Sequence, residues 1–138
     1  DLANPGLKLV IAAAEVPVGK YSIEFLDKAS QDAALGVTFK DDVLKNVVSY
    51  EENVKAVLTK VGLGESDAGS VYLTDISLDN ASKVGRLDIP DALNAVATYP
   101  IAVVSDTAQP ELAQAFLDLV LSAQGQEVLS KYGFLPAD

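Results

Sequence analysis

The pattern of apolar positions is most regular in one short stretch near the middle of the chain. Its apolar residues follow the i, i+3, i+4, i+7 spacing of a helix that lies against a core: Val54, Val57, Leu58 and Val61. We therefore predict a helix over residues 51–61. The preceding residues 46–50 are typical of a short strand. This strand–helix junction is the element around which the rest of the chain is organised.

A strand that ends where a helix begins leaves unpaired backbone N–H groups pointing out of the junction. Such a helix start suits an anion without further chemistry. Two side chains are candidates to cap this helix: Ser49, which stands three residues before Glu52 as in a capping box, and Asn53. An ordinary βα unit of an α/β domain is the alternative explanation of the same stretch.

A second junction of this kind is predicted near the beginning of the chain. Residues 7–13 are typical of a buried strand, and a loop with Pro17 and Gly19 follows. A helix is expected over residues 20–34, ended by Gly36. Its inner face is expected to comprise Tyr21, Phe25, Leu26 and Ala29.

The middle of the chain predicts shorter elements. They are a charged link at 40–42, a strand at 70–73, a capped turn or short helix at 74–78, a strand at 83–89, a helical turn at 92–96 and a buried strand at 99–104. Strands that alternate with helices predict an α/β fold with a mostly parallel sheet.

Two helices are predicted in the last part of the chain. Pro110 at the first helical position opens a long helix. Its apolar stripe comprises Ala113, Phe116, Leu117, Val120 and Leu121. A second helix over residues 123–132 carries Val128 and Leu129 inward and ends at Gly133.

Composition excludes several classes of function. The net charge of −10 argues against nucleic acid and anionic lipid as partners, because both need a basic face. The chain has no His and no Cys, which excludes Ser-His and Cys-His nucleophiles and the usual zinc sites. No apolar run approaches the ~20 residues of a membrane span. Because Met is absent as well, Asp1 is expected to be a processed or constructed start, and removal of a signal peptide before it is one option.

Five segments in order resemble the molybdate/tungstate-binding proteins of bacterial ABC uptake systems. They are Glu15-Val16-Pro17-Val18-Gly19-Lys20-Tyr21, Glu52-Asn53-Val54-Lys55-Ala56-Val57, Gly64-Glu65-Ser66-Asp67-Ala68-Gly69-Ser70-Val71-Tyr72, Tyr99-Pro100-Ile101-Ala102-Val103, and Gly125-Gln126 with Tyr132-Gly133-Phe134. The resemblance implies a three-layer α/β lobe of the type II periplasmic-binding-protein arrangement. In that family, two lobes close on a tetrahedral oxyanion.

The resemblance also implies the ligand and its contacts. Val18 and Val54 would each offer a backbone N–H to molybdate or tungstate, and Tyr72 would offer its phenol hydroxyl. No catalytic residue, cofactor or direct cation ligand is expected. Lys20 and Lys55 would soften the repulsion of an anion or simply be solvated, and Tyr21 and Tyr99 are expected to serve packing. The partner would be a membrane ABC permease, and the location periplasmic or extracellular, with a membrane anchor on the full-length protein as one option.

The chain departs from the family in lacking its first lobe. Residues 1–105 resemble the second lobe, and residues 106–138 the C-terminal segment that packs on the first lobe in the family. The stripe of the Pro110 helix would then lose its docking surface, and it would fold back on its own lobe or exchange with a second copy to form a homo-oligomer. A half-protein that does not bind alone is a further expectation.

Two other classes of function remain open at this point. An enzyme could use a carboxylate pair, Asp41/Asp42 or Glu51/Glu52, although adjacent carboxylates usually serve as solvated or capping residues and no nucleophile is positioned. A ligand-sensing domain of a transcriptional regulator shares the same lobe architecture. It would normally follow a DNA-binding segment, which this sequence does not contain.

Overall fold

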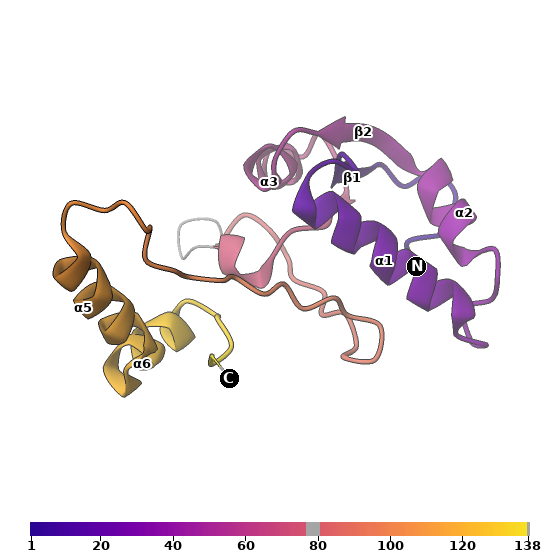
Figure 1. Cartoon of the computed structure of the whole chain (residues 1–138). Helices are drawn as coiled ribbons and strands as arrows, with labels where there is room; N and C mark the ends of the chain where they lie inside the picture. Colours follow the sequence, from indigo (N-terminus) through magenta and orange to yellow (C-terminus); the bar gives the residue numbers. More distant parts are fainter. Residues whose placement is uncertain (77–80, 138) are drawn as a thin grey trace. The chain divides into compact units, whose positions relative to one another are not determined.

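The computed structural model describes residues 1–76 and 81–137. The chain divides into two compact units, Asp1–Val96 and Ala97–Asp138, and each is described by itself (Figure 1).

A three-stranded parallel sheet forms the centre of residues 1–96. Its strands are β1 (Leu9–Ala12), β2 (Val47–Glu51) and β3 (Ala68–Gly69), in the order β2-β1-β3. Leu9 of β1 stands opposite Val47 on one side and Ala68 on the other. All four residues of β1 are buried, as expected for the central strand of a parallel sheet. The predicted α/β fold with a parallel sheet is confirmed.

The helical elements of this unit pack on the sheet in two layers (Figure 1). They are α1 (Pro17–Gln31), α2 (Phe39–Lys45) and α3 (Val54–Gly62); the 3₁₀ turn η1 (Leu73–Asp75) follows β3. Alternate residues of a strand point to opposite faces of the sheet. Leu9 accordingly joins a core cluster with α1 and α2: Leu26, Ala29, Phe39 and Val43. Val10 and Ala12 join a second cluster with Val18 of α1 and Val57 of α3, so the predicted three-layer arrangement is present.

Helix α1 begins three residues earlier than predicted, at Pro17. The fixed φ of proline suits the first helical position, where no N–H is needed. The helix ends at Gln31, before the predicted Ala34, and Gly36 lies beyond it with φ of 85°. On the predicted inner face, Leu26 and Ala29 are buried, while Tyr21 and Phe25 are half-buried.

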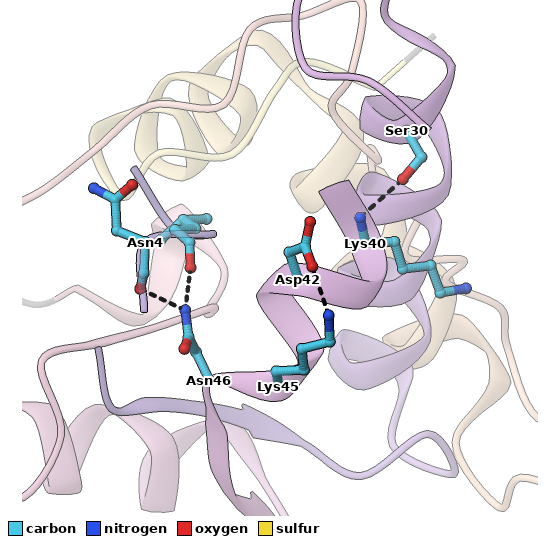
Figure 2. A network of polar contacts seen from close by, with 7 residues as sticks. Asn4, Ser30, Lys40, Asp42, Lys45 and Asn46 are labelled. Atoms are coloured by element: carbon cyan, nitrogen blue, oxygen red, sulfur yellow. Dashed lines mark hydrogen bonds and ion pairs between the residues drawn. The ribbon is translucent and has the colours of Figure 1, made fainter. Parts of the chain in front are cut away.

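The charged link expected at residues 40–42 is wrong, because these residues belong to α2. The spacing of Phe39 and Val43 places both on one face of a helix, and both are buried. The intervening charges point outward, and the Lys45 ammonium lies 2.7 Å from the Asp42 carboxylate (Figure 2). The stretch that was predicted to be a charged link is therefore part of a short amphipathic helix.

Polar side chains fix both ends of α2 (Figure 2). The Lys40 N–H donates to Ser30 Oγ of α1 over 2.9 Å. Asn46, which follows α2, donates from Nδ2 to the carbonyl oxygens of Leu2 and Asn4, each at 2.8 Å. The Asn46 bonds hold the N-terminal segment against the beginning of β2, and the Lys40 bond joins α2 to α1.

The strands expected at residues 83–89 and 99–104 are wrong, since neither segment pairs with a strand in the described part of the chain. The predicted strand at 70–73 lies instead at Ala68–Gly69. The turn expected at 74–78 corresponds to η1, but its residues 77 and 78 lie outside the described residues. A turn at 91–93 replaces the helical turn expected at 92–96.

Residues 97–138 contain the two predicted C-terminal helices, α5 (Pro110–Leu121) and α6 (Ala123–Lys131). Every residue of α5 and α6 is described, and none of them is buried. Phe116 of the predicted apolar stripe is 61% exposed, and Val128, which was predicted to point inward, is 48% exposed. The expected docking of residues 106–138 on another surface stays a prediction. Among the described helices, none combines the length and apolar character needed to cross a membrane.

Candidate functional site

The carboxyl ends of β1 and β2 are held side by side. Ala12 stands opposite Glu51, and the Ala13 N–H donates to the Glu51 carbonyl oxygen over 2.8 Å. Helix α1 follows β1 and helix α3 follows β2, so the two helix starts emerge from neighbouring strand ends. Ligands of open α/β sheets collect at this edge.

Val18 occupies the second position of α1, after the N-cap Val16 and Pro17. Its side chain is 3% exposed and belongs to the core, so only its backbone is available to a ligand. Within residues 1–76 and 81–137, the N–H groups of Val18 and Gly19 meet no acceptor, as expected for the first turn of a helix.

Gly19 explains how α1 begins so close to the strand that precedes it. A Cβ at this position would overlap the carbonyl oxygens of Ala12 and Ala13. Only glycine therefore allows the first turn of α1 to lie directly against the end of β1.

Val54 is the first residue of α3, and its half-buried side chain packs against the cluster that contains Val18. Of the two candidate caps, Asn53 is the actual one, because its Oδ1 accepts the Ala56 N–H at 3.0 Å. The N–H groups of Val54 and Lys55 meet no acceptor within the described residues. The exposed helix start predicted from the sequence is thus present.

Ser49 has a different role from the predicted cap. Its hydroxyl donates to Glu51 Oε1 over 2.5 Å and accepts from the Lys60 ammonium at 3.0 Å. The Lys60 ammonium also lies 2.6 Å from Glu51 Oε1. These partners, Lys60 first, lower the pKa of the Glu51 carboxyl below its ordinary value. The contacts of Lys60 with Ser49 and Glu51 therefore join α3 to β2.

Tyr72 precedes η1, and its half-buried ring packs against the same cluster as Val54. The ring meets that of Tyr21 edge to face, with centroids 6.2 Å apart and planes at 65°. The Tyr72 N–H donates to Asp75 Oδ2 over 3.0 Å. The structure therefore gathers all three predicted site residues, Val18, Val54 and Tyr72, around one apolar cluster.

Two residues near this site were not predicted to take part in it. Tyr21 was expected only to pack, and its partner is the ring of Tyr72. Asp75 was expected only in a capped turn, and burial raises the pKa of its carboxyl while the Tyr72 N–H and Lys55 act in the opposite direction. The spacing of Tyr72 and Asp75, with an acidic residue three positions on, could have indicated the second of these.

One carboxylate of each pair proposed for an enzyme is bound by a lysine. Glu51 is bound by Lys60, and Asp42 by Lys45, whose hydrogen bond lowers the pKa of the Asp42 carboxyl. Among the described residues, no group of three or more Asp, Glu, His or Cys side chains is placed to hold a metal ion. Near Val18 and Val54, the donors in place are the backbone N–H groups of the two helix starts.

The family model described as bacterial extracellular solute-binding protein matches residues 1–135. The molybdate-binding protein ModA of Mycobacterium bovis is 38% identical over 134 residues, which cover 97% of this chain and 46% of that protein. The "Putative ABC transporter substrate-binding lipoprotein YvgL" of Bacillus subtilis is 33% identical over 120 residues, covering 86% of this chain and 42% of that protein. The chain thus spans about half the length of these curated relatives.

A solved structure, the "substrate binding domain of putative molybdenum ABC transporter from Clostridium difficile", is similar over the whole of this chain. The TM-score is 0.75 and the sequence identity 28%, and the match covers 57% of that structure.

Proposed function

The chain belongs to the bacterial extracellular solute-binding protein family, and from that premise we propose that it captures molybdate or tungstate for a membrane ABC permease. The relatives that suggest this ligand include the ModA protein of Mycobacterium bovis and the Clostridium difficile domain. Family membership favours a solute-binding role over a sensing domain of a transcriptional regulator. The protein acts outside the cytoplasm, and in the full-length form it carries a membrane anchor or moves freely.

The observation that carries this proposal is the convergence of Val18, Val54 and Tyr72 on one apolar cluster at the carboxyl edge of the sheet. Two helix starts direct N–H groups and the positive ends of their dipoles to this edge. This local field opposes the repulsion that a net charge of −10 exerts on an anion. The Tyr72 phenol adds a hydroxyl donor.

The mechanism is binding by preorganised N–H and O–H donors. No covalent step and no cofactor is needed, since the oxyanion is cargo that enters and leaves unchanged. The family relatives are about twice as long as this chain, so the remaining contacts to the anion come from the rest of the protein. Molybdate and tungstate are discriminated from smaller oxyanions by the size of the closed cavity.

Calorimetric titration of the chain with sodium molybdate tests the proposal. Tyr72→Phe removes one hydroxyl donor to a charged ligand and is expected to raise the dissociation constant about tenfold. Tyr50→Phe is the matched control, because Tyr50 lies on β2 with its side chain 57% exposed and outside the cluster of Val18.

The outcomes separate the parts of the proposal. Saturable binding that Tyr72→Phe weakens and Tyr50→Phe leaves unchanged supports both ligand and site. Binding that is insensitive to Tyr72→Phe contradicts the role of the phenol. A chain that binds no molybdate, beside a full-length protein that does, contradicts binding by this half alone.

A further inference from the structure

The main chain of Tyr72 is held from two directions by Asp75. The Tyr72 N–H donates to Asp75 Oδ2 over 3.0 Å, and the Asp75 N–H donates to the Tyr72 carbonyl oxygen over 3.1 Å. Together the two bonds close the turn η1. A 3₁₀ turn of three residues has few hydrogen bonds of its own, so the carboxylate bond is a large part of what fixes it.

The ring of Tyr72 is supported from another element. Tyr21 of α1 meets it edge to face at a centroid distance of 6.2 Å. Because Tyr21 lies one helical turn after Val18, this contact ties the Tyr72 ring to the helix start that offers the Val18 N–H. The direction of the phenol is thus set by its main chain on one side and its ring on the other.

The Asp75 carboxylate that accepts the Tyr72 N–H is partly removed from water. It lines an open cavity of about 450 Å³ together with residues of α3 and Lys83. The charged groups that share this cavity with Asp75 are Lys55 and Lys83. Removing a carboxylate from water costs free energy unless hydrogen bonds replace the lost hydration. The Tyr72 N–H is such a replacement, so the bond is a specific one rather than a chance surface contact.

We propose that Asp75 is a positioning residue for Tyr72. Its carboxylate accepts the Tyr72 N–H and fixes the turn that presents the phenol hydroxyl to the oxyanion; Asp75 itself does not contact the ligand. The ligand-related part of this inference rests on the proposed function, whereas the hold of Asp75 on the Tyr72 backbone does not.

Two substitutions separate positioning from general stability. Asp75→Ala removes the acceptor, and Asp75→Asn keeps an acceptor oxygen without the charge. Asp32→Ala is the matched control, because Asp32 Oδ1 accepts the Ala34 N–H over 2.8 Å in a loop after α1. The measurements are hydrogen exchange of the Tyr72 amide by NMR and molybdate titration of the same samples.

Asp75→Ala is expected to speed exchange of the Tyr72 amide about tenfold and to weaken molybdate binding by a similar factor. Asp75→Asn is expected to restore both to within about threefold of the parent chain, and Asp32→Ala to change neither. Failure of Asp75→Asn to restore exchange would overturn the assignment of the acceptor.

The remaining outcomes are equally decisive. Unchanged exchange of the Tyr72 amide in Asp75→Ala overturns the inference. Faster exchange without weaker binding, in a chain that binds molybdate, shows a structural turn and also overturns it. A parent chain that binds no molybdate refutes binding by this chain, while the exchange of the Tyr72 amide still decides whether Asp75 holds Tyr72 in place.

Discussion

Residues 1–96 and residues 97–138 use the same local devices to begin helices. In both units a helix opens with proline at its first position, Pro17 in α1 and Pro110 in α5. A helix in each is capped by a side-chain oxygen, since Asn53 caps α3 and Ser122 caps α6. These signals act over a few residues and do not depend on the rest of the fold.

The two units differ in what their helices bury. Helices α1, α2 and α3 contribute buried residues to two core clusters, whereas every residue of α5 and α6 is at least partly exposed. The apolar stripe of α5 is as regular as that of α3. The comparison teaches that a stripe specifies a helix and a face, while burial also requires a second surface to cover that face.

The largest expected effect contrasts a leucine from each unit. Leu26 in α1 is 3% exposed, and Leu26→Ala should lower the free energy of unfolding by about 3 kcal/mol. Leu112 in α5 is 68% exposed, and Leu112→Ala should stay within about 0.5 kcal/mol. Urea denaturation followed by far-ultraviolet circular dichroism measures both. A comparable loss for Leu112→Ala would break the comparison and show that α5 is covered in solution.

A glycine from each unit gives the next contrast. A Cβ at Gly19 would overlap the carbonyls at the end of β1, and one at Gly125 would overlap those of Leu119 and Val120. Gly19→Ala is expected to cost about 2 kcal/mol of global stability, because it pushes α1 away from the core. Gly125→Ala should disturb α6 without changing the unfolding of residues 1–96.

The control for these glycines is Gly62→Ala at the end of α3. Among the described residues, its Cβ would meet Val84 alone, at 4.0 Å, so the substitution should raise stability by about 0.5 kcal/mol. Thermal unfolding of the three variants ranks them. A loss of stability in Gly62→Ala as large as in Gly19→Ala would refute the steric explanation.

Much of the local structure followed from the sequence, and the long-range pairing did not. The stripe of α3, the proline of α5 and the strand before α3 are local patterns, and the structure contains all three. The segments 83–89 and 99–104 look like strands in isolation, but a strand exists only with a hydrogen-bonded neighbour. Helix α2 was missed because its charges outnumber the two apolar residues that it buries.

In the candidate site, too, the features set by neighbouring residues could be predicted from the sequence, and those that join distant residues could not. Val18, Val54 and Tyr72 came from a family resemblance, and the fold brings them together, although their contact with an anion stays a proposal. The support that Tyr21 gives Tyr72 joins residues far apart in the sequence, so no local pattern could show it. The bond from Asp75 lies within one turn and was within reach of sequence reasoning.

Removing a helix cap in each unit is expected to cost about 1 kcal/mol of stability. Asn53→Ala leaves the Ala56 N–H without its acceptor and should lower the stability of residues 1–96 by that amount. Ser122→Ala does the same to the Gly125 N–H, with an effect confined to α6. Amide exchange at Ala56 and Gly125 reports each loss separately. Spread of the Ser122→Ala effect to Ala56 would indicate that the two units unfold together.

The smallest expected effect depends on pH. The pKa of the Glu51 carboxyl is lowered in the fold, chiefly by Lys60, so its ionised form stabilises the native state. This stabilisation is complete above the ordinary value of 4.5 and disappears as pH falls through the lower native value. Glu51→Gln should therefore be less stable than the parent chain at neutral pH and equal to it in strong acid.

Glu52→Gln is the control for this pH dependence, because Glu52 is exposed and forms no ion pair among the described residues. Denaturation at a series of pH values compares the two variants. A stability difference for Glu51→Gln that persists below the native pKa would show that packing, rather than charge, links β2 to α3.

The edge-to-face contact of Tyr21 and Tyr72 has a consequence for fluorescence measurements on this protein in solution. The chain contains no tryptophan, so its ultraviolet fluorescence arises from its five tyrosines and is not masked by tryptophan emission. The rings of Tyr21 and Tyr72, with centroids 6.2 Å apart, are close enough to exchange excitation energy, which depolarises their emission. The polarisation of the tyrosine emission therefore depends in part on the contact between α1 and the residue that precedes η1, and it is measured without a label.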